Sequence, residues 1–362
     1  MGLQEKGRQS LIVAAMASGL LALAPVANAE EMDHSQHTQM DHSQHAQMDH
    51  SQMDHSSAAQ ASEHVHHAHG AGQWMFEYRY MRMDMEDLLD GSDSVSVKDV
   101  IGTMMAPGQY MMAPTEMTMS MHMFMAMYGF SDKLSAMVML NYLDNEMDMV
   151  NRMGVASSMD TSGVGDTQVG AMYNMKNGWV GALSLSIPTG ATDEEVENMM
   201  VPGTNRPAPY GMQLGSGTYD LIPSITYTAV QDSWTYGGQA EYTLRTGEND
   251  EEYTLGNKLE ISAWGKYALN KIVSIGGRLD YLNAGEIDGE NPNIPKPMGN
   301  FMAPTDDPAN YGGTRIDLGV DVTAEFGGHT LGFGYAVPVK QDVNGIQLET
   351  QSILTLSYMY MM

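Results

Sequence analysis

The feature that most constrains the fold is a run of alternating residues between Pro114 and Val150. In its first half, methionine occupies every second position from Met117 to Met127, with polar or aromatic residues in most of the gaps. Successive side chains of a β-strand point to opposite faces, so a strict period of two predicts a strand. The alternation resumes at Leu134 after a short polar turn. The run predicts two antiparallel strands, each with one face for hydrocarbon and one for a polar lumen.

The same alternation recurs in twelve segments of the chain. Short turns and longer loops alternate between these segments, which is typical of a bacterial outer-membrane barrel with short periplasmic turns. We therefore predict an all-β fold, a transmembrane antiparallel β-barrel of about twelve strands. A soluble β-sandwich is the alternative, but it does not account for so many apolar outward faces. The predicted strands are residues 74–85, 115–129, 133–149, 163–176, 178–188, 217–229, 233–246, 256–269, 271–283, 314–326, 329–340 and 346–361.

Two glycine-containing turns support this division. Asn177-Gly178 is a strong signal for a tight hairpin, because both central residues of a type I′ turn need a positive φ. Gly327-Gly328 has the same property. The segment 86–114 shows no alternation and is predicted to be a long loop.

The faces of the first strands follow from their aromatic residues. Trp74, Phe76, Tyr78 and Tyr80 alternate with residues that include Met75, Glu77, Arg79 and Met81. Aromatic girdles face lipid in such barrels, so the second set is predicted to point inward. Met137, Met139, Met147 and Met149 are predicted inward by the same reasoning.

For the methionine ladder of residues 117–127 we predict the opposite orientation. Its alternate face carries Glu116, Thr118, Ser120 and His122, and these polar residues are expected to line the lumen while the ladder meets lipid. His122 would then be an interior metal-ligand candidate. Ser120 and His122 are also a nucleophile–base pairing, but sequence identifies neither an orienting group nor an oxyanion hole, so no enzyme is predicted.

The chain is predicted to begin with a secretory signal peptide. Residues 1–29 combine Lys6 and Arg8, a short apolar run, and small residues before Glu30. The alternative, a membrane anchor, is disfavoured because spanning a bilayer takes about 20 apolar residues. The predicted organisation is residues 1–29 as signal peptide, 30–73 as tail and 74–362 as barrel.

The tail is a degenerate repeat of Met-Asp-His-Ser-Gln that holds ten of the twelve histidines. It has no Lys or Arg and almost no aliphatic residue, so it is predicted to be disordered. Imidazole suits copper and zinc, and thioether sulfur suits Cu(I), so a flexible His/Met segment is predicted to bind metal. A solubilising spacer is the alternative. The predicted ligands are Met32, His34, His37, Met40, His42, His45, Met48, His50, Met53, His55, His64, His66, His67 and His69, with His122 in the barrel.

Charge and cysteine content narrow the partners. A formal charge of −28 argues against nucleic acid, whose phosphates would be repelled. There is no cysteine, so stability must come from packing and sheet closure. The acidic groups at 193–195 and 250–252 could bind divalent cations near lipopolysaccharide, although exposed acidic loops usually stay solvated. The expected partners are outer-membrane lipid, lipopolysaccharide, metal ions and periplasmic copper carriers.

Two resemblances add to this. Gly163-Val164-Gly165-Asp166, Pro188-Thr189-Gly190, Gly217-Thr218-Tyr219-Asp220 and the phrases 307–315 and 342–345 resemble the outer-membrane barrel family named for the MetA pathway of phenol degradation. That resemblance implies an outer-membrane barrel and, for some members, small-molecule transport, without catalytic residues. The Met-Asp-His-Ser repeat resembles the tails of copper-resistance outer-membrane B proteins, which implies copper.

We therefore expect a barrel in the outer membrane of a Gram-negative bacterium, with its tail in the periplasm. The favoured hypothesis is capture of copper or a related soft metal, followed by its sequestration or export, with copper ion as the bound metal and no organic cofactor. The alternative is a passive channel for small hydrophobic or aromatic compounds. A barrel with a purely structural role is a third hypothesis. Inward methionines and an inward His122 would favour metal; inward aromatic residues and a blocked lumen would favour the channel.

Overall fold

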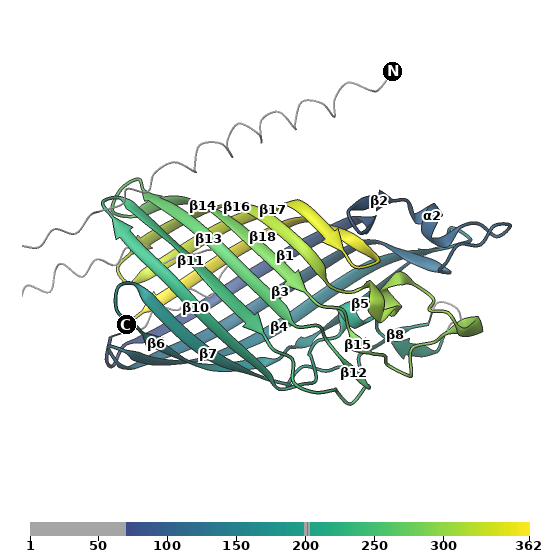
Figure 1. Cartoon of the computed structure of the whole chain (residues 1–362), viewed down its shortest axis with the longest axis horizontal. Helices are drawn as coiled ribbons and strands as arrows, with labels where there is room; N and C mark the ends of the chain where they lie inside the picture. Colours follow the sequence, from purple (N-terminus) through teal and green to yellow (C-terminus); the bar gives the residue numbers. More distant parts are fainter. Residues whose placement is uncertain (1–69, 199–200, 202) are drawn as a thin grey trace, which may run out of the picture. The chain divides into compact units, whose positions relative to one another are not determined.

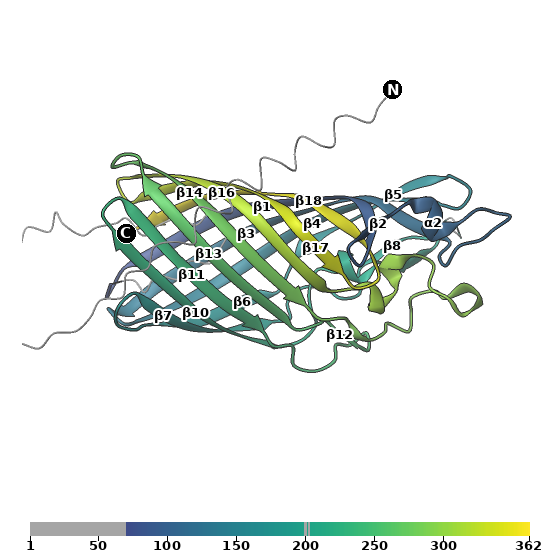
Figure 2. The same cartoon turned by 45° about the horizontal axis from the view of Figure 1, so that its top comes forward.

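The computed structural model describes residues 70–198, 201 and 203–362. In this part of the chain one antiparallel sheet closes on itself, because its last strand pairs with its first (Figures 1 and 2). Trp74 and Met362 exchange both backbone hydrogen bonds at the seam. The sheet has 14 strands, of which β2 and β5 lie outside the closed ring. The other twelve form the barrel, which confirms the predicted number of strands. They are β1 (Trp74–Asp90), β3 (Met112–Ser131), β4 (Leu134–Asn151), β6 (Thr167–Asn174), β7 (Trp179–Ile187), β10 (Asp220–Gln231), β11 (Trp234–Thr243), β13 (Lys258–Ala268), β14 (Val273–Ala284), β16 (Gly313–Phe326), β17 (His329–Val343) and β18 (Ile346–Met361).

The long connections contain short elements of their own. They gather at one end of the barrel, where Figure 1 shows β2, α2, β8, β12 and β15. The segment predicted as an unstructured loop, 86–114, instead contains the end of β1, a short strand and a short helix capped by Ser96. No helix of the described residues is long and apolar enough to cross a bilayer. The elements are β2 (Asp93–Val95), α2 (Val97–Ile101), β5 (Ala156–Val164), β8 (Glu195–Glu197), β9 (Asn205–Pro207), η1 (Tyr210–Met212), β12 (Tyr253–Thr254), β15 (Asp288–Gly289), η2 (Pro297–Gly299), η3 (Pro304–Asp306) and η4 (Pro308–Asn310).

The predicted strand 163–176 corresponds to β6, and most of β5 forms where the sequence predicted only a connection between strands. β5 and β6 both pair with β4, and the chain between them leaves the ladder at Gly165 and Asp166. The Asp166 carboxylate accepts hydrogen bonds from the backbone N–H groups of Gly190 and Ser216. Asp166 therefore holds the long loop that follows β7 next to the point where the chain passes from β5 into the ring strand β6.

Both predicted glycine turns are confirmed. Asn177 and Gly178 have φ values of 62° and 79°, and Gly327 and Gly328 have values of 58° and 81°. A Cβ on Gly178 would also lie 2.1 Å from the carbonyl oxygen of Thr228. Gly178 therefore serves both the turn and the close approach of a neighbouring strand.

The outward face of the barrel is an apolar belt with aromatic residues at its edges. Phe124 and Leu140 are 52% and 48% exposed, as residues facing hydrocarbon should be. At the short-turn end Trp74 packs against Tyr128, with ring centroids 4.8 Å apart. Toward the long-loop end Tyr80 packs against His122 at 5.1 Å. This pattern of an apolar band between two aromatic girdles is that of an outer-membrane barrel.

Candidate functional site in the barrel lumen

The barrel encloses a cavity of about 380 Å³, lined by side chains from most of its strands. A larger hollow of about 610 Å³ lies at the rim, lined by residues of β3, β4 and β5 and by Val97 of α2. We take the cavity in the lumen as the candidate site because side chains from strands all around the barrel line it. Its lining has two chemically different walls, one of methionine and one of charged and hydroxyl groups.

The methionine wall is built by β1, β3, β4 and β6. Met127, Met139 and Met172 are 1–2% exposed and belong to one buried cluster. Met81 and Met121, paired across β1 and β3, line the cavity itself. The inward orientation predicted for Met75, Met81, Met137, Met139, Met147 and Met149 agrees with their burial.

The predicted orientation of the ladder in β3 is wrong. Met117, Met123, Met125 and Met127 are all at most 8% exposed and point into the barrel. The reason is register: residues directly paired across two strands share a face, and Met75 of β1 pairs with Met127 of β3. Since the aromatic face of β1 meets lipid, as predicted, the ladder must lie inward with its methionine partners.

His122 consequently lies on the outside of the barrel, and its predicted place in the lumen is wrong. Its Nδ1 is 2.8 Å from the hydroxyl oxygen of Tyr78. Ser120 also lies outward, with its Oγ 3.2 Å from the hydroxyl of Tyr80. Each member of this Ser–His pair therefore hydrogen-bonds a tyrosine of β1 on the outer face of the barrel, His122 with Tyr78 and Ser120 with Tyr80.

The second wall carries charges that neutralise one another. The Arg278 guanidinium forms ion pairs with Asp280 of its own strand and, at 3.5 Å, with Asp321 of β16. Arg315 pairs with Asp317 at 3.0 Å. Sequence reasoning placed Glu77 and Arg79 inward but missed the charged wall of β13, β14 and β16, although it has a signal: opposite charges two residues apart in a predicted strand must share a face. Glu77 and Arg79, Lys258 and Glu260, Arg278 and Asp280, and Arg315 and Asp317 all follow that spacing.

At the long-loop end the loops fold together into a cap. Arg206 from β9 and Asp306 from η3 form an ion pair at 2.8 Å, with side chains 2% and 0% exposed. A tyrosine cluster lies beside them, with the rings of Tyr210 and Tyr253 4.8 Å apart. Burial raises the pKa of each of these two tyrosines to about 12. The cap thus has a buried core of its own.

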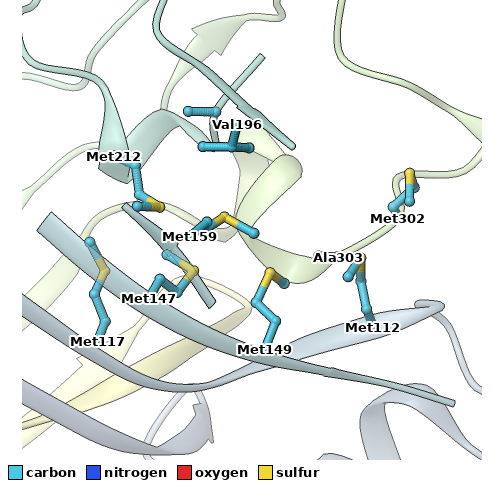
Figure 3. Close-up of a cluster of buried hydrophobic side chains, with 10 residues drawn as sticks. Met112, Met117, Met147, Met149, Met159, Val196, Met212, Met302 and Ala303 are labelled. Atoms are coloured by element: carbon cyan, nitrogen blue, oxygen red, sulfur yellow. The ribbon is translucent and has the colours of Figure 1, made fainter. Parts of the chain in front are cut away.

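Methionines join the cap to the barrel wall. A second buried cluster unites inward residues of β3, β4 and β5 with Met212 of η1 and with Met302 and Ala303 before η3 (Figure 3). Met149 and Met212 are fully buried there. The seven methionines of this cluster are Met112, Met117, Met147, Met149, Met159, Met212 and Met302.

The predicted tail ligands, from Met32 to His69, lie outside the described residues. Within the described residues no group of three or more His, Cys, Asp or Glu side chains is arranged to hold a metal ion. Metal binding by His122 stays a prediction, but it can no longer rest on a position in the lumen.

Residues 115–291 match the model of the family named for the MetA pathway of phenol degradation. The match covers the phrases at 163–166, 188–190 and 217–220 and supports that resemblance. It ends before the phrases at 307–315 and 342–345, and it does not concern the copper-like repeat of the tail. No curated protein sequence matches the chain.

Solved structures similar to this chain are outer-membrane barrels. The crystal structure of an outer membrane channel from Pseudomonas putida F1 is 15% identical, with a TM-score of 0.53, and the match covers 82% of this chain and 97% of that one. The β domain of the Bordetella autotransporter BrkA is 13% identical, with a TM-score of 0.45 and coverage of 80% and 99%. The P. putida toluene transporter TodX is 7% identical, with a TM-score of 0.41 and coverage of 80% and 90%. At this identity the likeness to the P. putida channel shows the fold alone.

Proposed function

We propose that this protein is an outer-membrane channel, and not an enzyme, for small molecules that combine an aromatic or apolar part with a polar group. The observation that carries the proposal is the enclosed cavity with its two unlike walls. A volume of about 380 Å³ falls within the usual range for small-molecule sites, roughly 300–1,000 Å³.

The methionine wall suits the apolar part of such a molecule. Met81, Met121, Met123 and Met139 present thioethers to the cavity. Thioether sulfur makes favourable contacts with aromatic rings, and the unbranched side chain adapts to different shapes. A ring moving along this wall would therefore find contacts without a rigid pocket to trap it.

The opposite wall suits the polar group. Gln239, Ser262 and Asp280 line the cavity together with the ion pairs of Arg278 and Arg315. Paired charges offer hydrogen-bond donors and acceptors while largely cancelling each other's long-range fields. We therefore expect neutral and zwitterionic molecules to pass more readily than strongly charged ones. The name of the similar P. putida structure, an outer membrane channel, is consistent with this function.

Uptake into proteoliposomes tests the proposal. The purified full-length protein is compared with empty vesicles, using phenylalanine, a zwitterion that lipid excludes, and glutamine as a polar molecule of similar size. Phenylalanine should enter several-fold faster than glutamine. Met123→Trp, which narrows the cavity, should slow entry, whereas the outward Phe124→Trp should not. Equal rates with protein-containing and empty vesicles would refute the channel.

A second candidate function is capture of copper by the tail, followed by its sequestration or export through the barrel. The inward methionines favour it, because thioether sulfur suits Cu(I). Its test compares cell-associated copper under copper stress in a deletion strain that carries either the full chain or one lacking residues 30–73. Excess copper that only the full chain corrects would support it. Unchanged copper in every strain would refute it.

A further inference from the structure

Methionine is segregated to one face of the barrel strands. Every methionine in the described strands lies on the inward face, and all of them belong to the adjacent strands β18, β1, β3, β4, β5 and β6. The outward positions of the same strands hold residues such as Phe124, Leu140 and Tyr358. Methionine is an unbranched, adaptable apolar side chain that packs against many shapes. A preference for apolar bulk alone would therefore place methionine on both faces.

Strand register aligns these methionines into rows across the sheet. Residues directly paired in an antiparallel sheet have Cβ atoms about 4.5–5.5 Å apart, so two thioether side chains can converge on one ion. Near the cap, one row runs from β1 to β5. Near the short turns, another runs from β18 to β4. The two rows are Met85–Met117–Met147–Met159 and Met361–Met75–Met127–Met137.

Paired methionines also occupy the length of the lumen between the rows. Met83 pairs with Met119, Met81 with Met121, and Met125 with Met139. Met83 sulfur lies 3.6 Å from the guanidinium Nη1 of Arg315, so at least this thioether already acts as an acceptor in the lumen. Thioether groups thus extend from the short-turn end of the barrel to the cap.

A methionine from outside the sheet, Met212 of η1, packs against the row near the cap. Figure 3 shows the side chains of Met147, Met159 and Met212 extending toward one another from β4, β5 and η1. Their exposed fractions are 2%, 6% and 0%. Met117 contributes from β3, directly paired with Met147. The site combines neutral sulfur groups from three strands with one from the cap.

We propose that this methionine face binds a soft monovalent cation, Cu(I) or Ag(I), with its principal site at Met117, Met147, Met159 and Met212. Thioether ligands select Cu(I) and similar soft ions over Mg²⁺, Ca²⁺ and Zn²⁺, which prefer oxygen, nitrogen or thiolate ligands. The described residues hold no carboxylate or histidine cluster that would favour those harder ions. The inference stands on barrel residues and does not rest on passage of small molecules.

The test uses the full-length protein labelled with ¹³C in the methionine methyl groups and titrated with Ag(I). Signals of Met147, Met159 and Met212, assigned by single Met→Leu substitutions, should shift at the first equivalents of Ag(I). Met105 and Met298, which are 100% and 98% exposed in loops, provide the internal control and should shift only in excess. Zn(II) should not shift the cluster signals.

A matched pair of variants measures stoichiometry. Met147→Leu/Met159→Leu/Met212→Leu keeps side-chain volume and should bind at least one Ag(I) fewer per chain. Met104→Leu/Met105→Leu/Met298→Leu should bind as many as the unaltered protein. The tail is the same in all three proteins, so its own binding cancels. If the first variant does not assemble into a barrel, the methyl shifts of the unaltered protein decide. Cluster signals that move no earlier than those of Met105 would overturn the proposal, as would equal stoichiometry in an assembled variant.

Discussion

Replacing Asp306 with Asn should open the cap without unfolding the barrel. The Arg206–Asp306 pair is 2.8 Å long, and both side chains are almost wholly buried. At an effective dielectric constant of 20, two unit charges at that distance attract by about 6 kcal/mol, an amount that desolvation of the two ions largely offsets. Removing one partner leaves the guanidinium of Arg206 buried without its counter-charge, which typically costs about 3–5 kcal/mol.

That cost corresponds to an increase of roughly 10²- to 4 × 10³-fold in the population of open cap, since each 1.4 kcal/mol is tenfold. Hydrogen exchange of the full-length protein in detergent measures it. Amides around β9 and η3 should lose protection by that factor, while those of the barrel strands keep theirs. Arg206→Met/Asp306→Leu removes both charges and should recover most of the protection.

The exposed pair of Arg82 and Asp84 provides the control. It has a similar length of 2.8 Å, but its side chains are 46% and 39% exposed. Such pairs contribute at most about 1 kcal/mol, so Asp84→Asn should change protection little. Unchanged exchange around β9 and η3 in Asp306→Asn would refute the view that this ion pair holds the cap closed.

Three further predictions follow from the same structure. Burial raises the pKa of Tyr210 and Tyr253 to about 12, against about 10 in the unfolded chain. The cap should therefore keep its stability below pH 10 and lose it as pH rises from 10 toward 12. Hydrogen exchange of the cap amides and tyrosinate absorbance measure this. Unchanged protection at pH 12 would contradict this. Gly178→Ala should lower the free energy of unfolding in urea by about 1–2 kcal/mol or more, because φ is 79° and the new Cβ would meet the carbonyl oxygen of Thr228. Gly265→Ala is the control, since there is open space around the position of its Cβ. Phe124→Lys, on the lipid face, should cost about 2–4 kcal/mol on refolding into vesicles, and a cost near zero would refute the orientation of β3.

Strands and tight turns could be predicted from the sequence because their signals are local. Alternation at period two and the Asn177-Gly178 dipeptide involve neighbours along the chain, and both predictions were confirmed. The face of β3 was predicted wrongly because polarity was judged strand by strand. The short hairpin to β4 pairs Met125 with Met139, so a face chosen for one residue determines the other. Applying that register would have placed the ladder inward.

The charged face of the lumen could have been predicted from the sequence, whereas the contacts that form the cap could not. Opposite charges at positions i and i+2, as in Arg278 and Asp280, give both the strand and its shared face. The cap instead depends on meetings between distant loops, such as Arg206 with Asp306. Neither loop has a repeating pattern that specifies its partner, so only the folded barrel brings the two together.

The hydrogen bonds of the cap join residues that are far apart along the chain, and this separation determines the order in which the protein assembles. The Asn310 side-chain amide donates to the Tyr110 hydroxyl, a contact between residues 200 positions apart, and the Gly211 N–H donates to the Tyr311 hydroxyl across 100 positions. Bringing such distant segments together costs loop-closure entropy that only the pairing of the intervening strands can offset. The cap should therefore form after the ring of strands has closed. An intermediate whose strands have all paired but whose cap has not yet formed should precede the native state. Proteases should cut the loops of this intermediate while its strands resist.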